Sequence, residues 1–278
     1  MTLIGGMFDS IDDLIARLGE NHYFLDRDVA TAIFLGSRLA KPVLLDGEPG
    51  TGKTDLARVL ATAADTVQFT LQCYPGIDQA SALSEWDPIQ DHLVKRPLLA
   101  ALTWEGERPP ILLIDDVDRV DGEFAAFLVG VLRDLCVNVV GVGTVRAVRA
   151  PLAILTADLP GEVATPLRQS CLFQRLSYPS FERERAIVVA RVPGVGSSLA
   201  GQICNFVARM RQEAFKRKPG VGETLDWARA LTVLHRSVLD ADTIDQTLGC
   251  VLKDQEDIKR FRRRPLSPTP RPLLDRTG

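Results

Sequence analysis

A glycine-rich segment, GEPGTGKT at residues 47–54, constrains the fold of this chain more than any other feature. It matches the pattern G-x-x-x-x-G-K-[ST] and stands between an apolar run, PVLLD, and a helical pattern, TDLARVLATAA. Gly50 and Gly52 let the backbone curl so that several N–H groups point inward at one anion. The following helix adds the positive end of its dipole. The segment therefore predicts a strand–loop–helix unit that binds the phosphates of a nucleotide.

The side chains of this loop have separate expected roles. Lys53 places a positive charge against the β- and γ-phosphates, and the Thr54 hydroxyl can bind Mg²⁺. A turn that binds nothing is the alternative, and the strand before the loop and the helix after it disfavour that alternative. The predicted nucleotide-binding residues are Gly47, Glu48, Pro49, Gly50, Thr51, Gly52, Lys53, Thr54 and Asp55.

Apolar runs alternate with helical patterns over the first two thirds of the chain. The run ILLID at 111–115 shows no polar alternation, so both of its faces should be buried, as in a parallel sheet covered by helices. The other predicted strands are 42–46, 67–71 and 152–156, and the predicted helices are 9–20, 28–39, 54–64 and 123–135. Such alternation predicts an α/β fold with an αβα arrangement.

The remaining third of the chain is predicted to be helical. Helical spacing recurs over 181–191, 198–215, 223–238 and 243–261. We therefore expect a nucleotide-binding domain over residues 1–178 and a helical lid domain over 179–262. The last segment, 263–278, contains four prolines and is expected to be a disordered tail.

Composition limits the class of protein. The 278 residues are 46% hydrophobic and 25% charged, with a net charge of −3, which gives no global electrostatic reason to expect nucleic acid. The five cysteines are dispersed without a C-x-x-C pair, as in reduced proteins, and the three histidines show no metal-ligand spacing. Neither a signal peptide nor a membrane-length apolar run is evident. We expect a cytoplasmic protein without a membrane or nucleic-acid partner.

Two adjacent carboxylates follow the buried run at 111–115. Asp115 is expected to orient Mg²⁺, usually through water. Asp116 stands where phosphate-loop ATPases normally carry a glutamate that polarises the attacking water. Its side chain is one methylene shorter, and a misplacement of about 1 Å can lower a rate on the order of 10²-fold. Intact binding with slower hydrolysis is the expected result.

These segments together resemble the MoxR-type AAA+ ATPases, and within them the carbon monoxide dehydrogenase maturation (CoxD) branch. The resemblance runs from about residue 10 to residue 262. It rests on ATAIFLGSRLAKPVLLDGEPGTGKTDLA, LQCYPGID, KRPLLAAL, LLIDDVDRVDGEFAAFL, YPSFERERAIVVARVPG, GVGETLDWARAL and LKDQEDI. LQCYPGID and ETLDWARAL are more specific than the phosphate loop.

The resemblance implies an AAA+ core followed by a helical lid. It also implies assembly into a homo- or hetero-oligomeric ring, usually a hexamer, with ATP held between subunits. Members of the family act as chaperone-like remodellers, often beside a partner with a von Willebrand A domain. Several of them help to mature metal centres, which implies a metalloenzyme client.

Carried over residue by residue, the match is uneven. The family usually has Thr-Ser-Asn after the fourth core strand, and this chain has Thr156-Ala157-Asp158. An ionised Asp158 can only accept hydrogen bonds and would repel the γ-phosphate, so Thr156 is the candidate sensor at this edge. The family's arginine-finger cluster Leu-Arg-Arg-Arg-Cys reads LRQSC at 167–171, which leaves Arg168 as the candidate finger and Ser170 in place of an arginine.

Two further departures concern the lid and a core insertion. Arg229 is the nearest candidate for the lid's sensor arginine, and the alternative is an arginine on the exposed face of an amphipathic helix. The segment DPIQDHLVK at 87–95 looks shorter than its family counterpart.

Three readings stay open. The first is a Mg-ATP-dependent remodeller whose hydrolysis is weakened at Asp116, Asp158 and Ser170. The second is a hydrolysis-deficient subunit that binds nucleotide within a mixed ring. The third, a phosphate-loop kinase, is disfavoured by the helical last third and by the family segments.

Overall fold

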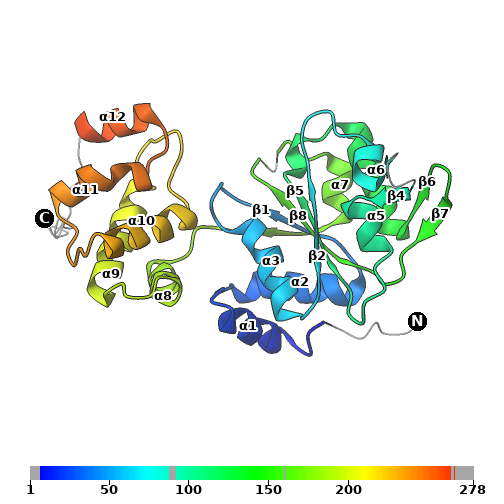
Figure 1. Ribbon diagram of the computed structural model, residues 1–278, viewed down its shortest axis with the longest axis horizontal. Helices are drawn as coiled ribbons and strands as arrows, with labels where there is room; N and C mark the ends of the chain where they lie inside the picture. Colours follow the sequence, from blue (N-terminus) through cyan, green and yellow to red (C-terminus); the bar gives the residue numbers. More distant parts are fainter. Residues whose placement is uncertain (1–6, 88–91, 160, 264–265, 267–278) are drawn as a thin grey trace, which may run out of the picture. The chain divides into compact units, whose positions relative to one another are not determined.

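The computed structural model describes residues 7–87, 92–159, 161–263 and 266 (Figure 1). Contacts divide the chain into two compact units. The first contains residues 1–48 and 52–177, and the second contains residues 49–51 and 178–278. Three residues of the glycine-rich loop thus group with the C-terminal part of the chain. The predicted tail at 263–278 lies almost entirely outside the described residues.

A five-stranded parallel sheet forms the centre of the first unit, in the order β2-β5-β8-β1-β9. These strands are β1 (Val43–Asp46), β2 (Gln68–Gln72), β5 (Ile111–Asp115), β8 (Leu152–Ala157) and β9 (Leu172–Arg175). The predicted α/β fold with a parallel sheet is confirmed. Strand β9 was not predicted; it pairs with β1 at the edge of the sheet and has alternating half-buried and exposed residues.

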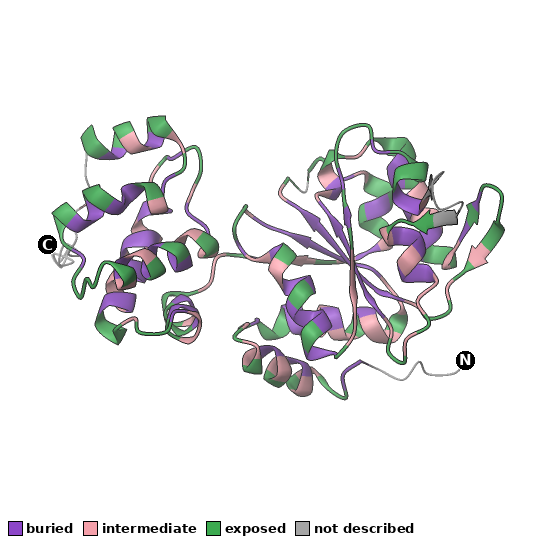
Figure 2. Ribbon diagram, in the orientation of Figure 1, coloured by how far each residue is buried: buried purple, intermediate pink, exposed green. Residues whose placement is uncertain are grey.

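Both faces of the inner strands are buried, as the unbroken apolar runs predict. Every residue of β1, β5 and β8 is buried (Figure 2). Neighbouring residues of one strand face opposite sides, so Leu112 and Leu113 of β5 belong to two different apolar clusters. The cluster with Leu112 contains residues of α5 and α6, and the cluster with Leu113 contains residues of α1, α2 and α3.

Three helices of the first unit begin at a polar residue whose side chain caps them, namely Ser10, Asp78 and Asp121. Ser10 and Asp121 accept hydrogen bonds from the backbone N–H groups of Asp13 and Phe124, which satisfies donors that a helix start leaves free. The helices are α1 (Ile11–Glu20), α2 (Arg27–Leu39), α3 (Lys53–Ala63), α4 (Gln79–Leu83), α5 (Pro97–Leu102), α6 (Gly122–Asp134) and α7 (Thr165–Ser170).

Two short antiparallel hairpins were not predicted. One pairs β3 (Ser84–Asp87) with β4 (His92–Lys95), and the other pairs β6 (Cys136–Val139) with β7 (Gly143–Arg146). The first hairpin occupies the segment 87–95 that looks short beside the family, and residues 88–91 of that segment lie outside the description.

Helices make up the described part of the second unit. They are α8 (Phe181–Arg191), α9 (Ser197–Met210), α10 (Val221–Val233), α11 (Ala241–Thr247) and α12 (Gln255–Arg263), with a 3-10 turn at Leu248–Cys250. The predicted helix 198–215 is too long, because α9 ends at Met210. The single helix predicted over 243–261 is wrong. Its apolar spacing continues, but the Asp254 carboxylate accepts from the N–H groups of Glu256 and Asp257 and starts a new helix there.

A buried ion pair holds the second unit together. Arg211, just after α9, bonds through two nitrogens to both carboxylate oxygens of Glu184 on α8, at 2.6 and 2.7 Å. Glu184 is only 1% exposed, and it also accepts a bond of 2.8 Å from the Thr224 hydroxyl. The Arg211 guanidinium lies 4.2 Å from the ring centre of Tyr178. The buried pair therefore links α8, the end of α9 and α10.

The same unit contains the tip of the glycine-rich loop. The Tyr178 hydroxyl donates to the Pro49 carbonyl at 3.0 Å, and the Val221 N–H donates to the Gly50 carbonyl at 2.8 Å. Gly50 and Gly220 meet so closely that a Cβ on Gly220 would lie 2.6 Å from the Gly50 Cα. Both positions therefore require glycine for space.

Removal of the buried arginine is expected to destabilise the protein strongly. Arg211→Met leaves the Glu184 carboxylate buried without its charged partner, which should lower the free energy of unfolding by about 3–5 kcal/mol. Denaturant unfolding measures this change. Arg262→Ala removes an exposed pair with Asp245 and serves as the control, with an expected change within about 0.5 kcal/mol. Equal effects of the two substitutions would contradict the prediction.

The contact between the two glycines makes a second prediction. Gly220 has a φ of −82°, which alanine can adopt, so Gly220→Ala tests space alone. Overpacking against Gly50 should lower the free energy of unfolding by about 1–3 kcal/mol. The matched control is Gly222→Ala, two residues along, where a Cβ meets nothing within 4 Å. If both variants unfold alike, the loop tip does not contact Gly220 in solution.

Candidate nucleotide-binding site

The polar residues of the candidate site lie where neighbouring parallel strands end. Strands β5, β8 and β1 are adjacent in the sheet, and parallel pairing brings their carboxyl ends to one edge. Asp115 ends β5, Thr156 lies near the end of β8, and the glycine-rich loop follows Asp46 of β1. The topology thus assembles residues that are up to 110 positions apart, Asp46 and Thr156, into one cluster.

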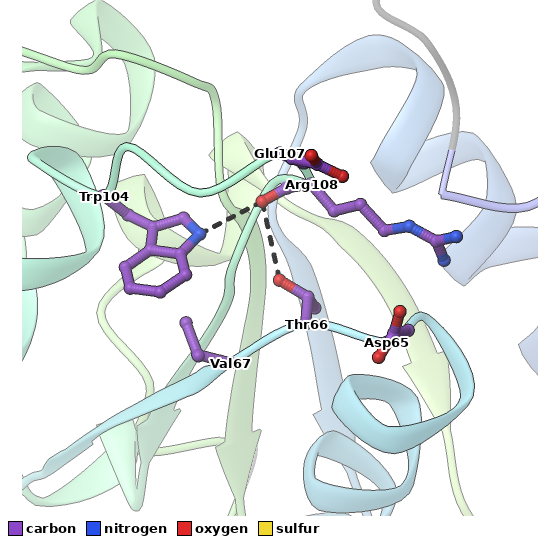
Figure 3. Close-up of a pocket in the computed structure, with 6 residues that line it drawn as sticks. All are labelled: Asp65, Thr66, Val67, Trp104, Glu107 and Arg108. Carbon is purple, nitrogen blue, oxygen red and sulfur yellow. Dashed lines mark hydrogen bonds between the residues drawn. The ribbon is translucent and has the colours of Figure 1, made fainter.

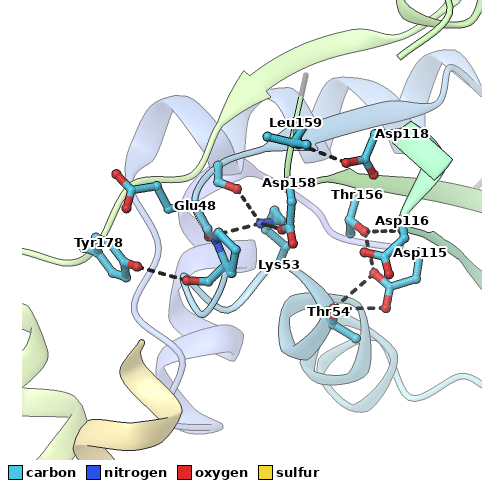
Figure 4. Close-up of polar contacts among 12 residues, drawn as sticks. Glu48, Lys53, Thr54, Asp115, Asp116, Asp118, Thr156, Asp158, Leu159 and Tyr178 are labelled. Carbon is cyan, nitrogen blue, oxygen red and sulfur yellow. Dashed lines mark hydrogen bonds and ion pairs between the residues drawn. The ribbon is translucent and has the colours of Figure 1, made fainter. Parts of the chain in front are cut away.

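Lys53 is the centre of this cluster (Figure 4). Its ammonium group donates to the carbonyls of Gly47 at 2.7 Å and Glu48 at 3.1 Å, and it pairs with Asp158 at 2.8 Å. The Lys53 side chain is only 7% exposed, so these contacts are poorly screened by water. Lys53 also begins α3, so the positive end of the helix lies at the same place.

A second group of contacts surrounds Asp115. Its two carboxylate oxygens accept from the Thr54 hydroxyl at 3.1 and 3.2 Å. The Thr156 hydroxyl donates to Asp115 as well, and it accepts from the Asp116 N–H at 3.0 Å. Thr156 thereby fixes both aspartates at once, which is a positioning role.

The oxygen atoms of this group are of the type that Mg²⁺ prefers as ligands. The Thr54 hydroxyl and the Asp115 carboxylate are hard oxygen ligands in direct contact, and Mg²⁺ sites usually combine one or two such ligands with phosphates and water. Among the described residues, no cluster of three or more histidine, cysteine or acidic side chains is arranged to hold a metal by itself. A bound magnesium ion would therefore depend on the nucleotide for its other ligands.

Asp116 is held in an uncommon backbone conformation. Its φ of 60° lies in the left-handed region, which non-glycine residues seldom adopt outside turns and functional sites. Its carboxylate accepts from the Gln72 amide at 3.0 Å and lies 3.4 Å from the Arg119 guanidinium. Gln72 was not predicted as a site residue. Its only signal in the sequence is its place at the end of the strand beside β5.

The surroundings of Asp116 change its acidity. Burial raises the pKa of its carboxyl, Arg119 opposes that rise, and the carboxylates of Asp115, Asp158 and Asp118 add to it. A carboxylate with a raised pKa is a better proton acceptor than an ordinary aspartate. Burial of Cys73, together with the carboxylates of Asp115, Asp116 and Asp118, raises the pKa of its thiol to about 12, which disfavours the reactive thiolate.

The remaining predicted loop residues have the following conformations and contacts. Gly47, Gly50 and Gly52 all have positive φ, as the curled loop requires. The Gly52 carbonyl accepts from the Tyr23 hydroxyl at 3.1 Å, a contact that the sequence did not predict. Asp55 bonds to Arg58 on the outer side of α3. Pro49, Gly50 and Thr51 belong to the second unit.

None of the hydrogen bonds described above involves the candidate arginines Arg168 and Arg229. Arg168 is exposed on α7, and the neighbouring Ser170 donates its hydroxyl to the Leu167 carbonyl. Arg229 lies on α10 of the second unit, half exposed and 3.0 Å from Asp226. The finger and sensor roles of Arg168 and Arg229 stay predictions.

A pocket of about 300 Å³ lies elsewhere in the first unit. Figure 3 shows its six lining residues, among them Trp104, whose indole N–H donates to the Arg108 carbonyl at 3.1 Å. Thr66 and Val67 precede β2 and Arg108 precedes β5, so the pocket is at the amino ends of these strands. The glycine-rich loop follows the carboxyl end of β1, so the pocket is not the phosphate site.

The Thr156 contacts predict a sharp difference between two conservative substitutions. Thr156→Val keeps the shape but removes the hydroxyl, so the Asp116 N–H loses its acceptor and Asp115 loses a donor. We expect a loss of about 1–3 kcal/mol in the free energy of unfolding, together with weaker Mg²⁺-dependent nucleotide binding. Thr156→Ser keeps the hydroxyl and should lose less than half as much. The prediction fails if serine and valine behave alike.

Comparison with known proteins shows what the sequence of this chain is similar to. Residues 42–164 match the model of the AAA domain, dynein-related subfamily. The RuvB subunit of the Holliday junction branch migration complex from Gluconobacter oxydans is 28% identical over 231 residues, which are 80% of this chain and 60% of that protein. The Lon protease of Metamycoplasma arthritidis is 29% identical over 111 residues, which are 38% of this chain and 13% of the protease. The chain thus spans less than two thirds of both relatives.

Solved structures share the fold. The Holliday junction branch migration motor RuvB of Thermotoga maritima superposes with a TM-score of 0.52 at 20% identity, covering 88% of this chain and 73% of that one. A variant of the same protein superposes with a TM-score of 0.54 at 19% identity, covering 90% of this chain and 74% of that chain. Among the described helices, none has the length and apolar character of a membrane span. The chain therefore has the phosphate-loop AAA+ fold, and residues 42–164 are similar to the AAA domain, dynein-related subfamily.

Proposed function

We propose that this protein is a Mg-ATP-dependent ATPase with slow hydrolysis, acting as a remodeller of other proteins. One observation carries the proposal: at the carboxyl edge of the sheet the hydroxyls of Thr54 and Thr156 both donate to Asp115. Lys53, the residue before Thr54, places its buried ammonium group against Asp158 and the loop carbonyls. This cluster supplies one fixed positive charge and hard oxygen ligands beside a loop with glycines at the required positions. Phosphoryl transfer depends mostly on such positioning and charge neutralisation.

Each residue has a defined task in this proposal. The loop backbone and Lys53 bind the phosphates of ATP, and Thr54 and Asp115 hold Mg²⁺. When bound, Mg²⁺ supplies positive charge that offsets the charge of the phosphate oxygens. Asp116 accepts a proton from the water that attacks the γ-phosphorus, and the bond to the bridging oxygen breaks to give ADP and phosphate.

Three departures support slow turnover. Asp116 keeps a carboxylate with one methylene fewer than glutamate, and that carboxylate is held by contacts with Gln72 and Arg119. The Asp158 carboxylate forms an ion pair with Lys53 and so offsets the positive charge that would attract the phosphates. Ser170 stands where the resemblance implies an arginine. A subunit that only holds ATP within a mixed ring is the alternative, and the retained carboxylate of Asp116 favours slow hydrolysis over none.

Assembly and partners complete the proposal. RuvB, a relative, is by name a subunit of a complex, and a ring with ATP at subunit contacts would let the exposed Arg168 reach a neighbouring site. A von Willebrand A partner, a metalloenzyme client, a hexameric ring and a cytoplasmic location rest on the family resemblance and the composition. We keep the expectation that nucleic acid is not a partner.

The test is steady-state ATP turnover across protein concentration. Wild-type turnover per subunit should rise with concentration because sites are completed by neighbours. Lys53→Ala should lower it by at least about 10²-fold, and Asp116→Glu should raise it by about tenfold to 10²-fold, since the carboxylate regains its reach. Binding without turnover in wild type and in Asp116→Glu would favour the nucleotide-holding subunit. Stimulation by four-way junction DNA would instead indicate a RuvB-like role.

The pH dependence of turnover provides a further check on Asp116. The carboxylate must be ionised to accept a proton, and its pKa lies above that of an ordinary aspartate. Turnover should therefore fall as pH drops through the raised pKa, above the value of about 3.9 of an unperturbed aspartate. In Asp116→Asn this acid limb should disappear together with the turnover.

A further inference from the structure

We propose that Asp158 is a specificity-determining residue, an internal counter-ion of Lys53 that disfavours ATP relative to ADP. The inference rests on the proposed nucleotide site. It differs from a general weakening of hydrolysis, because it concerns the ground-state affinity for two nucleotides rather than the rate of a chemical step.

Asp158 occupies one of the three donors of Lys53. A lysine ammonium has three N–H groups, and the three partners of Lys53 are the carbonyls of Gly47 and Glu48 and the Asp158 carboxylate. Both carbonyls belong to the loop itself, so only Asp158 comes from another element. A phosphate oxygen that approaches Lys53 must therefore displace or share the bond to Asp158.

The backbone around Asp158 keeps its carboxylate near the phosphates. Thr156, two residues before it, is bonded to Asp115 and to the Asp116 N–H. Leu159, directly after it, donates its N–H to the Asp118 carboxylate at 3.0 Å. The Asp158 side chain is 31% exposed and can rotate off Lys53, but its backbone is held on both sides. The negative charge accordingly stays close to a bound nucleotide.

The charge penalises the triphosphate more than the diphosphate. Other carboxylates already lie close by: Asp158 is one of the charges that raise the pKa of Asp116, and Asp118 accepts from the N–H of Leu159, the residue after Asp158. ATP adds one more anionic phosphoryl group beside Lys53 than ADP does, and like charges repel strongly in a partly buried site. The loop N–H groups bind the phosphates that both nucleotides share. The site is therefore expected to bind ADP more tightly than ATP.

The experiment is calorimetric titration of the full chain in Mg²⁺ with ADP and with the non-hydrolysable β,γ-imido analogue of ATP. The measured quantity is the ratio of the two Kd values, analogue over ADP. Asp158→Asn removes the charge, keeps the size and supplies a donor, so the ratio should fall by about tenfold or more. Asp158→Glu keeps the charge and should keep a ratio within about threefold of the wild-type value.

Asp134→Asn is the matched control. Asp134 ends α6 and bonds to Arg133 on the exposed surface, so the same chemical change there should leave the ratio unaltered. Thermal unfolding of each variant confirms that it folds.

The outcomes separate the inference from the function on which it rests. If both nucleotides bind and the ratio is the same in wild type and Asp158→Asn, the inference is overturned and the nucleotide site stands. If Asp158→Asn weakens the binding of the analogue, Asp158 assists the γ-phosphate and the inference is also overturned. If neither nucleotide binds to folded wild type or to Asp158→Asn, both the inference and the proposed function are overturned. A shift of equal size in Asp134→Asn would assign the effect to net charge and overturn the inference.

Discussion

Parallel pairing of β5, β8 and β1 is the constraint on which the candidate site depends. It places the ends of three buried strands at one edge, with Leu45 opposite Thr156 and Leu113 opposite Ile154. A shift of one residue in β5 or β8 would turn Thr156 away from Asp115 and bury the wrong side chains on each face. Because both faces are packed with apolar residues, that shift is costly, and the apolar core thereby fixes the geometry of the polar cluster.

The polar cluster is electrostatically unbalanced. Asp115, Asp116, Asp118 and Asp158 follow two neighbouring strands, and Lys53 is the buried cation that meets one of them. Hydrogen bonds from Thr54, Thr156 and Gln72 offset part of this excess negative charge without neutralising it. Excess negative charge of this kind attracts a cation such as Mg²⁺ and repels additional anionic groups. The carboxylate of Asp158 is therefore proposed to affect the relative affinities for ATP and ADP.

The sequence predicted the features that depend on local pattern. The loop at 47–54 and the runs at 111–115 and 152–156 carry strong signals, because glycine spacing and unbroken apolar runs have few alternative structures. Gln72, Tyr23 and Tyr178 could not be found in this way, since their roles come from contacts with residues distant in the chain. Periodicity also failed at Asp254, where a capping side chain ends one helical segment and starts another within a continuous apolar pattern.

Hydrogen bonds to the carbonyls of the glycine-rich loop orient its peptide units. The carbonyls of Pro49, Gly50 and Gly52 accept from Tyr178, Val221 and Tyr23, all outside the loop. In a planar trans peptide the carbonyl and the following N–H point in opposite directions. Each of these contacts therefore fixes the direction of the N–H group that follows the carbonyl, those of Gly50, Thr51 and Lys53. The two tyrosines and the start of α10 thus determine the loop conformation together with the glycines.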